Sequence, residues 1–185
     1  DERRRAFVAY YALVSWMDHN VGRILGALEE SGLADDTVVI YSSDHGDNVG
    51  ARGLWGKSNM YEESVAVPLL MAHPDLPPAT CETPVSLVDL AVTIPDCFGL
   101  AGEPGMVGES LADIAKRDTD PDRAVFSEYH AAGAVTGAFM IRKARHKLIH
   151  YHGFEDELFD LEADPEELVN LIADSRYKIV LEDLW

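Results

Sequence analysis

Residues 37–64 of the chain read Thr37-VVIYSSDHGDNVGARGLWGKSNMYEE-Ser64. The first six are rich in β-branched and aromatic side chains, which predicts a short buried strand over 37–42. Asp44, His45 and Gly46 follow this strand almost at once. In open α/β sheets, ligands bind just beyond the carboxyl ends of the strands. We therefore expect the Asp44 carboxylate and the His45 imidazole to lie at a binding site, where both can reach one cation.

Lys57 follows in a loop that contains an aromatic residue and two glycines, a suitable place for a positive charge that faces an anion. The triplet Asp44-His45-Gly46 is weak evidence by itself. Asp residues in such triplets often accept a hydrogen bond from their own backbone in a turn. On local chemistry alone, a simple turn remains the alternative to a binding site.

The whole stretch closely resembles one segment of the sulfatases, which belong to the alkaline-phosphatase-like superfamily. The residues that match at fixed spacing are Ser43-Asp44-His45-Gly46-Asp47, Gly50, Gly53-Leu54-Trp55-Gly56-Lys57, Tyr61-Glu62-Glu63-Ser64 and Val67-Pro68. So many matches make the resemblance highly specific. It covers nearly all of this chain, but only the C-terminal part of a sulfatase.

The resemblance implies an α/β fold of the alkaline-phosphatase and sulfatase type. We expect part of a mixed, mostly parallel sheet flanked by helices, together with a small C-terminal antiparallel sheet and a helix. Residues 1–117 would form the C-terminal part of the catalytic α/β domain. Residues 118–185 would form the small antiparallel subdomain.

Individual elements follow from the spacing of apolar residues. Apolar side chains repeat at helical spacing from Phe7 to Leu28, which predicts a long helix ended by Gly32, and the resemblance packs it on the sheet. The other expected elements are a buried strand over 67–72, a helix over 85–98 that kinks or ends early at Pro95, a helical turn over 111–116, extended runs over 124–129, 138–143, 146–151 and 157–161, and a helix capped by Asp164.

Composition limits the partners of the chain. Its 185 residues predict one domain, with room for an appendage, and no run is long enough to span a membrane. The formal net charge of −18 argues against nucleic acid and against anionic membrane surfaces. An anionic substrate would therefore need local positive charge, which a bound metal and Lys57 could supply.

Cysteine usage and the first residues say little about the compartment. Cys81 and Cys97 make neither a disulfide framework nor a zinc spacing, so we expect two free thiols. The chain starts at Asp1 without a methionine and enters a helix at once, so its true beginning can lie upstream. A cytoplasmic, periplasmic or secreted location stays open.

The resemblance also implies a mechanism. Sulfatases hydrolyse sulfate esters with a formylglycine nucleophile, made from a Cys or Ser in a C/S-x-P-x-R motif, and with a divalent cation. Carried over by position, Asp44 and His45 are metal ligands. Lys57 is a catalytic residue that holds a sulfate oxygen or helps neutralise the leaving group. The metal is expected to be Ca²⁺, with Mg²⁺ or Mn²⁺ as alternatives, and a hard cation prefers oxygen ligands, so His45 is the less comfortable ligand.

Part of the active site is absent from the sequence. No C/S-x-P-x-R motif occurs, and Cys81-Glu82-Thr83-Pro84 has its proline one place too late and no arginine. We therefore expect the nucleophile to lie in a missing N-terminal part of the same protein. The 185 residues alone are expected to be inactive.

Three further residues are candidates for contacts with the substrate. Arg52 stands in a pair, Ala51-Arg52, where many sulfatases have Asp-His, so it either meets an acidic substrate or is a solvated loop charge. Glu128 and His130 end an extended run near the expected substrate-side loops and either contact the alcohol portion or form a polar turn. The remaining histidines of the C-terminal part are expected to be structural or surface groups, namely His146, His150 and His152.

Three functions remain open at this point. The first is hydrolysis of a sulfate ester, with a small-molecule or saccharide substrate such as a sugar, choline or aryl sulfate. The second is hydrolysis of a phosphonate or phosphate monoester, because these tetrahedral anions make similar demands on a site. The third is a non-catalytic C-terminal fragment. The sequence is compatible with a homo-oligomer but does not predict one.

Overall fold

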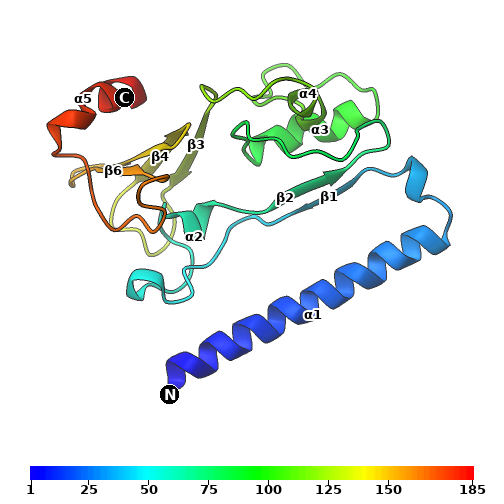
Figure 1. Ribbon diagram of the computed structural model, residues 1–185, viewed down its shortest axis with the longest axis horizontal. Helices are drawn as coiled ribbons and strands as arrows, with labels where there is room; N and C mark the ends of the chain where they lie inside the picture. Colours follow the sequence, from blue (N-terminus) through cyan, green and yellow to red (C-terminus); the bar gives the residue numbers. More distant parts are fainter.

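A computed structural model describes all residues, 1–185, as two antiparallel sheets accompanied by helices (Figure 1). The elements in chain order are α1 (Glu2–Glu30), β1 (Val39–Ser42), α2 (Glu62–Val65), β2 (Leu69–Ala72), α3 (Val88–Cys97), α4 (Leu111–Ala115), β3 (Ala124–Tyr129), β4 (Ala138–Lys143), β5 (His146–Tyr151), β6 (Glu157–Asp160) and α5 (Lys178–Leu184). Single 3₁₀ turns occur at Ala34–Asp36, Ala51–Gly53 and Ser175–Tyr177.

The first sheet corrects the expectation of a mostly parallel sheet. It consists of β1 and β2 alone, and they pair antiparallel, with Ser42 opposite Leu69 and Val39 opposite Ala72. A parallel pair needs a crossover that carries the chain back to the start of the first strand. Here the connection loops out from the carboxyl end of β1 and re-enters β2 at that same end. The α/β class is confirmed, but no parallel strand pair occurs in this chain.

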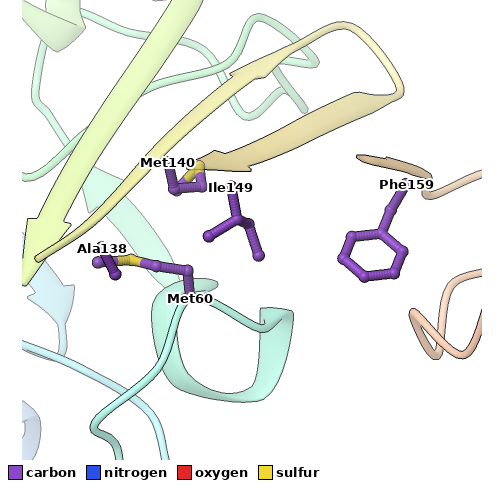
Figure 2. Packing of buried hydrophobic residues seen from close by; sticks show 5 residues of the cluster. All are labelled: Met60, Ala138, Met140, Ile149 and Phe159. Atoms are coloured by element: carbon purple, nitrogen blue, oxygen red, sulfur yellow. The ribbon is translucent and has the colours of Figure 1, made fainter. Parts of the chain in front are cut away.

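The second sheet has the order β3-β4-β5-β6, and each pair of neighbours is antiparallel. Its strands lie where the extended runs of the sequence predict them. The largest core cluster joins this sheet to the segment before α2 and consists of Met60, Ala138, Met140, Ile149 and Phe159 (Figure 2). Because Met60 packs against the sheet, the core crosses the expected boundary at residue 117.

The long helix α1 is present, but its apolar face is not covered. Figure 1 shows α1 on one side of the β1-β2 ribbon and α3 with α4 on the other. None of the side chains of α1 is buried, and Tyr11, Leu13 and Trp16 are each more than 60% exposed. The expectation that this helix packs tightly on the sheet is therefore wrong within these residues. None of the helices is long and apolar enough to cross a membrane.

The segment after β6 differs from the sequence prediction. Asp164 does not start a helix; its carboxylate accepts the backbone N–H groups of Leu168 and Val169, both at 2.8 Å, and closes a turn. Glu167 has a φ of 51°, in the left-handed region, which ends any helix at this point. Its side chain is buried against Lys147, so tertiary contacts override the local helix signal. The C-terminal helix is α5, which starts at Lys178, eleven residues after Glu167.

Asp89 anchors the start of α3. Its side chain is 1% exposed and lies 2.7 Å from the Arg123 guanidinium. It also accepts the backbone N–H groups of Ser86 at 2.8 Å and Glu109 at 2.9 Å. One buried carboxylate therefore fastens α3 to the segments before α4 and β3.

We expect Asp89→Ala to lower the free energy of unfolding by about 3 kcal/mol, because it leaves Arg123 without its buried partner. Chemical denaturation of the complete protein measures this loss. Asp113→Ala is the matched control, because the Asp113 carboxylate is exposed and 3.7 Å from Lys116; its effect should stay below about 0.5 kcal/mol. Equal losses for the two variants would contradict the anchoring role of Asp89.

Candidate active site

Asp44 and His45 lie just beyond the carboxyl end of β1, as the sequence predicts. The His45 Nδ1 lies 2.7 Å from the Gly46 carbonyl oxygen. A carbonyl only accepts, so Nδ1 is the donor in this contact, and the Lys57 ammonium, which only donates, makes Nε2 an acceptor. That Nε2 lies 3.4 Å from the Asp44 Oδ2 and also contacts the Lys57 ammonium. The structure thus brings the three main predicted residues together.

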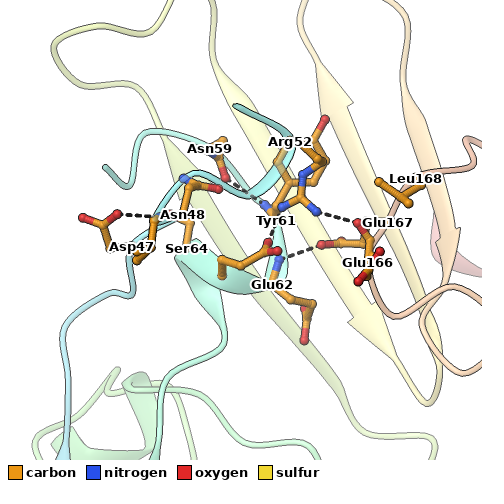
Figure 3. A network of polar contacts seen from close by, with 12 residues as sticks. Asp47, Asn48, Arg52, Asn59, Tyr61, Glu62, Ser64, Glu166, Glu167 and Leu168 are labelled. Carbon is orange, nitrogen blue, oxygen red and sulfur yellow. Dashed lines mark hydrogen bonds and ion pairs between the residues drawn. The ribbon is translucent and has the colours of Figure 1, made fainter. Parts of the chain in front are cut away.

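The loop between His45 and Lys57 is closed by its own polar groups, of which Figure 3 shows Asp47 and Asn48. The Asp47 Oδ1 accepts the backbone N–H groups of Val49 at 2.8 Å and Gly56 at 3.2 Å. The Asn48 side chain is buried and donates to the Gly56 carbonyl at 2.6 Å. These bonds fold the chain back on itself and return Lys57 to His45.

Asp44, His45 and Lys57 line one pocket of about 680 Å³. Its other walls come from the segment 59–69, from residues 85–88, which lead into α3, and from β3 and β4. Glu128 and Tyr129 of β3 are part of the lining. The Tyr129 hydroxyl lies 3.1 Å from the Ser58 hydroxyl, so the end of β3 is fastened next to Lys57.

The residues predicted on the substrate side have different surroundings. Glu128 is about half exposed in the pocket, and its carboxylate lies 3.4 Å from the His130 Nε2. His130 itself is not part of the pocket lining. The two histidines of the sheet with carboxylate partners are His146, 3.8 Å from Asp160, and His150, 2.8 Å from Asp156.

Arg52 is placed away from the pocket. Its guanidinium pairs with Glu63 and stacks 4.1 Å from the centroid of the Tyr61 ring. Both neighbours belong to the segment around α2. The Arg52 guanidinium therefore contacts this segment, is mostly shielded from solvent and does not line the pocket. Burial, followed by the nearby Glu157 carboxylate, raises the pKa of Tyr61 to about 12. Tyr61 therefore stays a neutral hydroxyl, which donates to Glu157 at 3.0 Å.

Two pocket residues were missed by sequence reasoning, Glu62 and Arg142. They line the pocket and form an ion pair of 3.0 Å. Glu62 belongs to the matched stretch, but its motif gives no sign of a partner in β4. Arg142 lies two residues after Met140 and so on the same face of β4. This two-residue period of the strand was the sequence signal that could have placed Arg142 beside the core.

The donor set fits a divalent cation in part. The chain supplies one carboxylate with an 82% exposed side chain, Asp44, and one imidazole nitrogen, the His45 Nε2, which contacts the Lys57 ammonium in this structure. No group of three or more His, Cys, Asp or Glu side chains that could hold a metal ion occurs in the chain. Asp44 and His45 can therefore contribute two ligands to a metal site, and any further ligands come from elsewhere.

Comparison with known proteins gives consistent results. A family model described as Sulfatase matches residues 1–100. The choline-sulfatase of Rhizobium meliloti is 38% identical over 178 residues, which cover 94% of this chain and 34% of that protein. Arylsulfatase K of Mus musculus is 36% identical over 92% of this chain and 32% of its own length. The chain thus spans about a third of the length of these relatives.

Solved structures agree with the sequence relatives. A structure determined in complex with its substrate, D-glucosamine-2-N,6-O-disulfate, matches with a TM-score of 0.81 and 32% identity, over 92% of this chain and 37% of that one. The phosphonate monoester hydrolase of Agrobacterium radiobacter matches with a TM-score of 0.80 and 29% identity, over 92% and 38%. From the family model and these relatives together, the chain belongs to the sulfatase family of the alkaline-phosphatase-like superfamily.

Proposed function

We propose that the protein containing this chain hydrolyses a sulfate ester. The observation that carries the proposal is the meeting of Asp44, His45 and Lys57 in one pocket. A carboxylate and an imidazole suit a divalent cation, and a lysine beside them suits a tetrahedral anion. Membership of the sulfatase family supports the same activity.

In this proposal Asp44 and His45 are metal ligands, and the metal is Ca²⁺, with Mg²⁺ or Mn²⁺ as alternatives. The Gly46 carbonyl fixes the His45 tautomer, so that Nε2 can donate its lone pair. When bound, the cation polarises the sulfate group. The Lys57 ammonium neutralises charge on a sulfate oxygen or on the leaving group. Glu128, backed by His130, contacts the alcohol portion of the ester.

The nucleophile is proposed to be a formylglycine supplied by an upstream part of the protein, because no motif for it occurs in these residues. The division into residues 1–117 and 118–185 also remains a proposal. Sugar, choline and aryl sulfates are all candidate substrates. A disulfated sugar is the substrate held by one matching structure, and choline-sulfatase is among the relatives, so a saccharide and choline are the two alcohols that specific matches favour.

Hydrolysis of a phosphonate or phosphate monoester is the second candidate. It is supported by the match to a phosphonate monoester hydrolase, whose TM-score of 0.80 nearly equals that of the sulfated-sugar complex. Both activities use a metal and a cation near a tetrahedral anion, so the part of the site in this chain suits either.

The decisive experiment compares the two activities in the complete protein. We expect kcat/KM for 4-nitrophenyl sulfate to exceed that for 4-nitrophenyl phenylphosphonate, and we expect EDTA to abolish and Ca²⁺ to restore the activity. The isolated 185-residue chain, as a control, should turn over neither ester. A ratio in favour of the phosphonate would establish the second candidate. Loss of both activities in a correctly folded complete protein would overturn both.

A further inference from the structure

Lys147 of β5 is a fully buried lysine outside the predicted site. Its side chain is 0% exposed, and its Nζ lies 2.7 Å from both the Glu62 and the Glu167 carboxylates. Lysine is almost never fully buried unless it is paired. Burial raises the pKa of the Glu167 carboxyl, and the Lys147 ammonium partly offsets this rise. The Lys147 ammonium therefore lies between two carboxylates and balances their negative charge.

The partner of Lys147 across the sheet is another cation. Lys147 lies directly opposite Arg142 of β4 in the strand register. Like charges in this position repel each other unless a counter-ion is shared. Glu62 provides it, because one carboxylate oxygen binds Lys147 at 2.7 Å and the other binds Arg142 at 3.0 Å. Two cations of the sheet, Lys147 and Arg142, therefore bind the carboxylate of one α2 residue, Glu62.

Further polar contacts join the region of α2 to the C-terminal part (Figure 3), beside the apolar packing of Val65 on the core cluster. The Glu62 backbone N–H donates to the Glu167 carboxylate at 2.7 Å. Glu63 pairs with Arg52, whose guanidinium also donates to the Glu166 carbonyl. A helix of one turn has little stability of its own, so the position of α2 depends on these polar contacts together with the packing of Met60 and Val65 on the sheet.

Ser64 of α2 binds the backbone on both sides of the candidate active site, next to His45 and at Lys57. The Ser64 carbonyl accepts the Gly46 N–H at 2.8 Å, directly after His45. The Ser64 hydroxyl donates to the Lys57 carbonyl. One buried residue thus binds the backbone next to His45 and the backbone of Lys57. Any shift of α2 changes the position of both side chains.

We propose that Lys147 is a positioning residue: by binding Glu62 and Glu167 it fixes α2, and through Ser64 it sets the geometry between His45 and Lys57. The proposal deepens the function proposed above and rests on it for its catalytic consequence. The structural connection itself does not depend on which ester is hydrolysed.

The test is a double-mutant cycle in the complete protein with Lys147→Met and Ser64→Ala. At a temperature well below both melting transitions, we expect Lys147→Met to lower kcat about tenfold and to change KM less than about twofold, because the site is misaligned while binding groups remain. The kcat of the double variant should be no lower than that of the more impaired single variant, because both changes interrupt one connection. Glu167→Gln, which keeps the shape of the side chain, should give a smaller loss of the same kind.

Lys143→Met is the matched control. Lys143 is the neighbour of Arg142 on β4, and it pairs with Asp183 of α5 at 2.9 Å, away from α2. Its replacement should leave kcat unchanged. An equal loss of kcat for Lys143→Met, or strictly additive effects of Lys147→Met and Ser64→Ala, would overturn the positioning role.

Hydrogen exchange provides a readout that needs no turnover. We expect Lys147→Met, and more weakly Glu167→Gln, to speed exchange of the Gly46 amide and of peptides over residues 44–57, while β1 exchanges as in the wild type. Wild-type exchange at Gly46 in both variants would overturn the proposal, even if their stability falls. A wild-type protein without ester hydrolysis would instead refute the proposed function, and exchange at Gly46 would still decide the role of Lys147.

Discussion

Asp44→Ala in the complete protein is expected to abolish metal-dependent ester hydrolysis, with a loss of about a thousandfold or more in kcat/KM. In the proposed metal site, Asp44 is the oxygen ligand of the pair that lies beyond β1. The remaining His45 nitrogen is a poor ligand for a hard cation.

The measurement is steady-state hydrolysis over a series of Ca²⁺ concentrations, together with metal content after dialysis. Asp118→Ala is the control, because Asp118 is an exposed aspartate outside the pocket lining. It should behave as the wild type in both assays. Activity of Asp44→Ala within about twofold of the wild type would refute the ligand assignment.

Gly46→Ala is expected to have the second-largest effect, a fall of about a hundredfold in kcat. A Cβ at this position would lie inside contact distance of the Glu63 carbonyl oxygen, which is backbone and cannot rotate away. Either the loop or α2 must then move, and the hydrogen bond from Gly46 to Ser64 is stretched. This movement displaces His45 and Lys57, so we expect the substitution to lower kcat.

The same substitution should lower the free energy of unfolding by about 1–3 kcal/mol, the usual cost of overpacking. Thermal unfolding and steady-state kinetics of the complete protein check both expectations. Gly102→Ala is the control, because its Cβ would meet only the flexible Met106 sulfur at 3.4 Å. Wild-type kinetics for Gly46→Ala would show that the loop tolerates this movement and that its contact with α2 is not needed.

Features that depend on neighbouring residues could be predicted from the amino-acid sequence. Asp44 and His45 follow a β-branched run, so their place at the end of a strand could be predicted from local pattern. The four strands of the C-terminal sheet have alternating side chains and turns at short range, and all four were found. The fixed spacing from Ser43 to Pro68 was sufficient to assign the family, which the comparisons confirm.

Features that depend on residues far apart in the chain became visible in the three-dimensional fold. The antiparallel pairing of β1 with β2 depends on the path of a long connection, which leaves no periodic signal in the sequence. Arg52 was expected in a solvated loop or at a substrate, but Glu63 and Tyr61 hold it. Glu167 was expected in a helix, but the buried Lys147 holds it in a left-handed turn. Leaving the buried Lys147 without a partner would cost about 3–5 kcal/mol. The helix propensity of one residue is worth less than about 1 kcal/mol, so the contact across the fold wins.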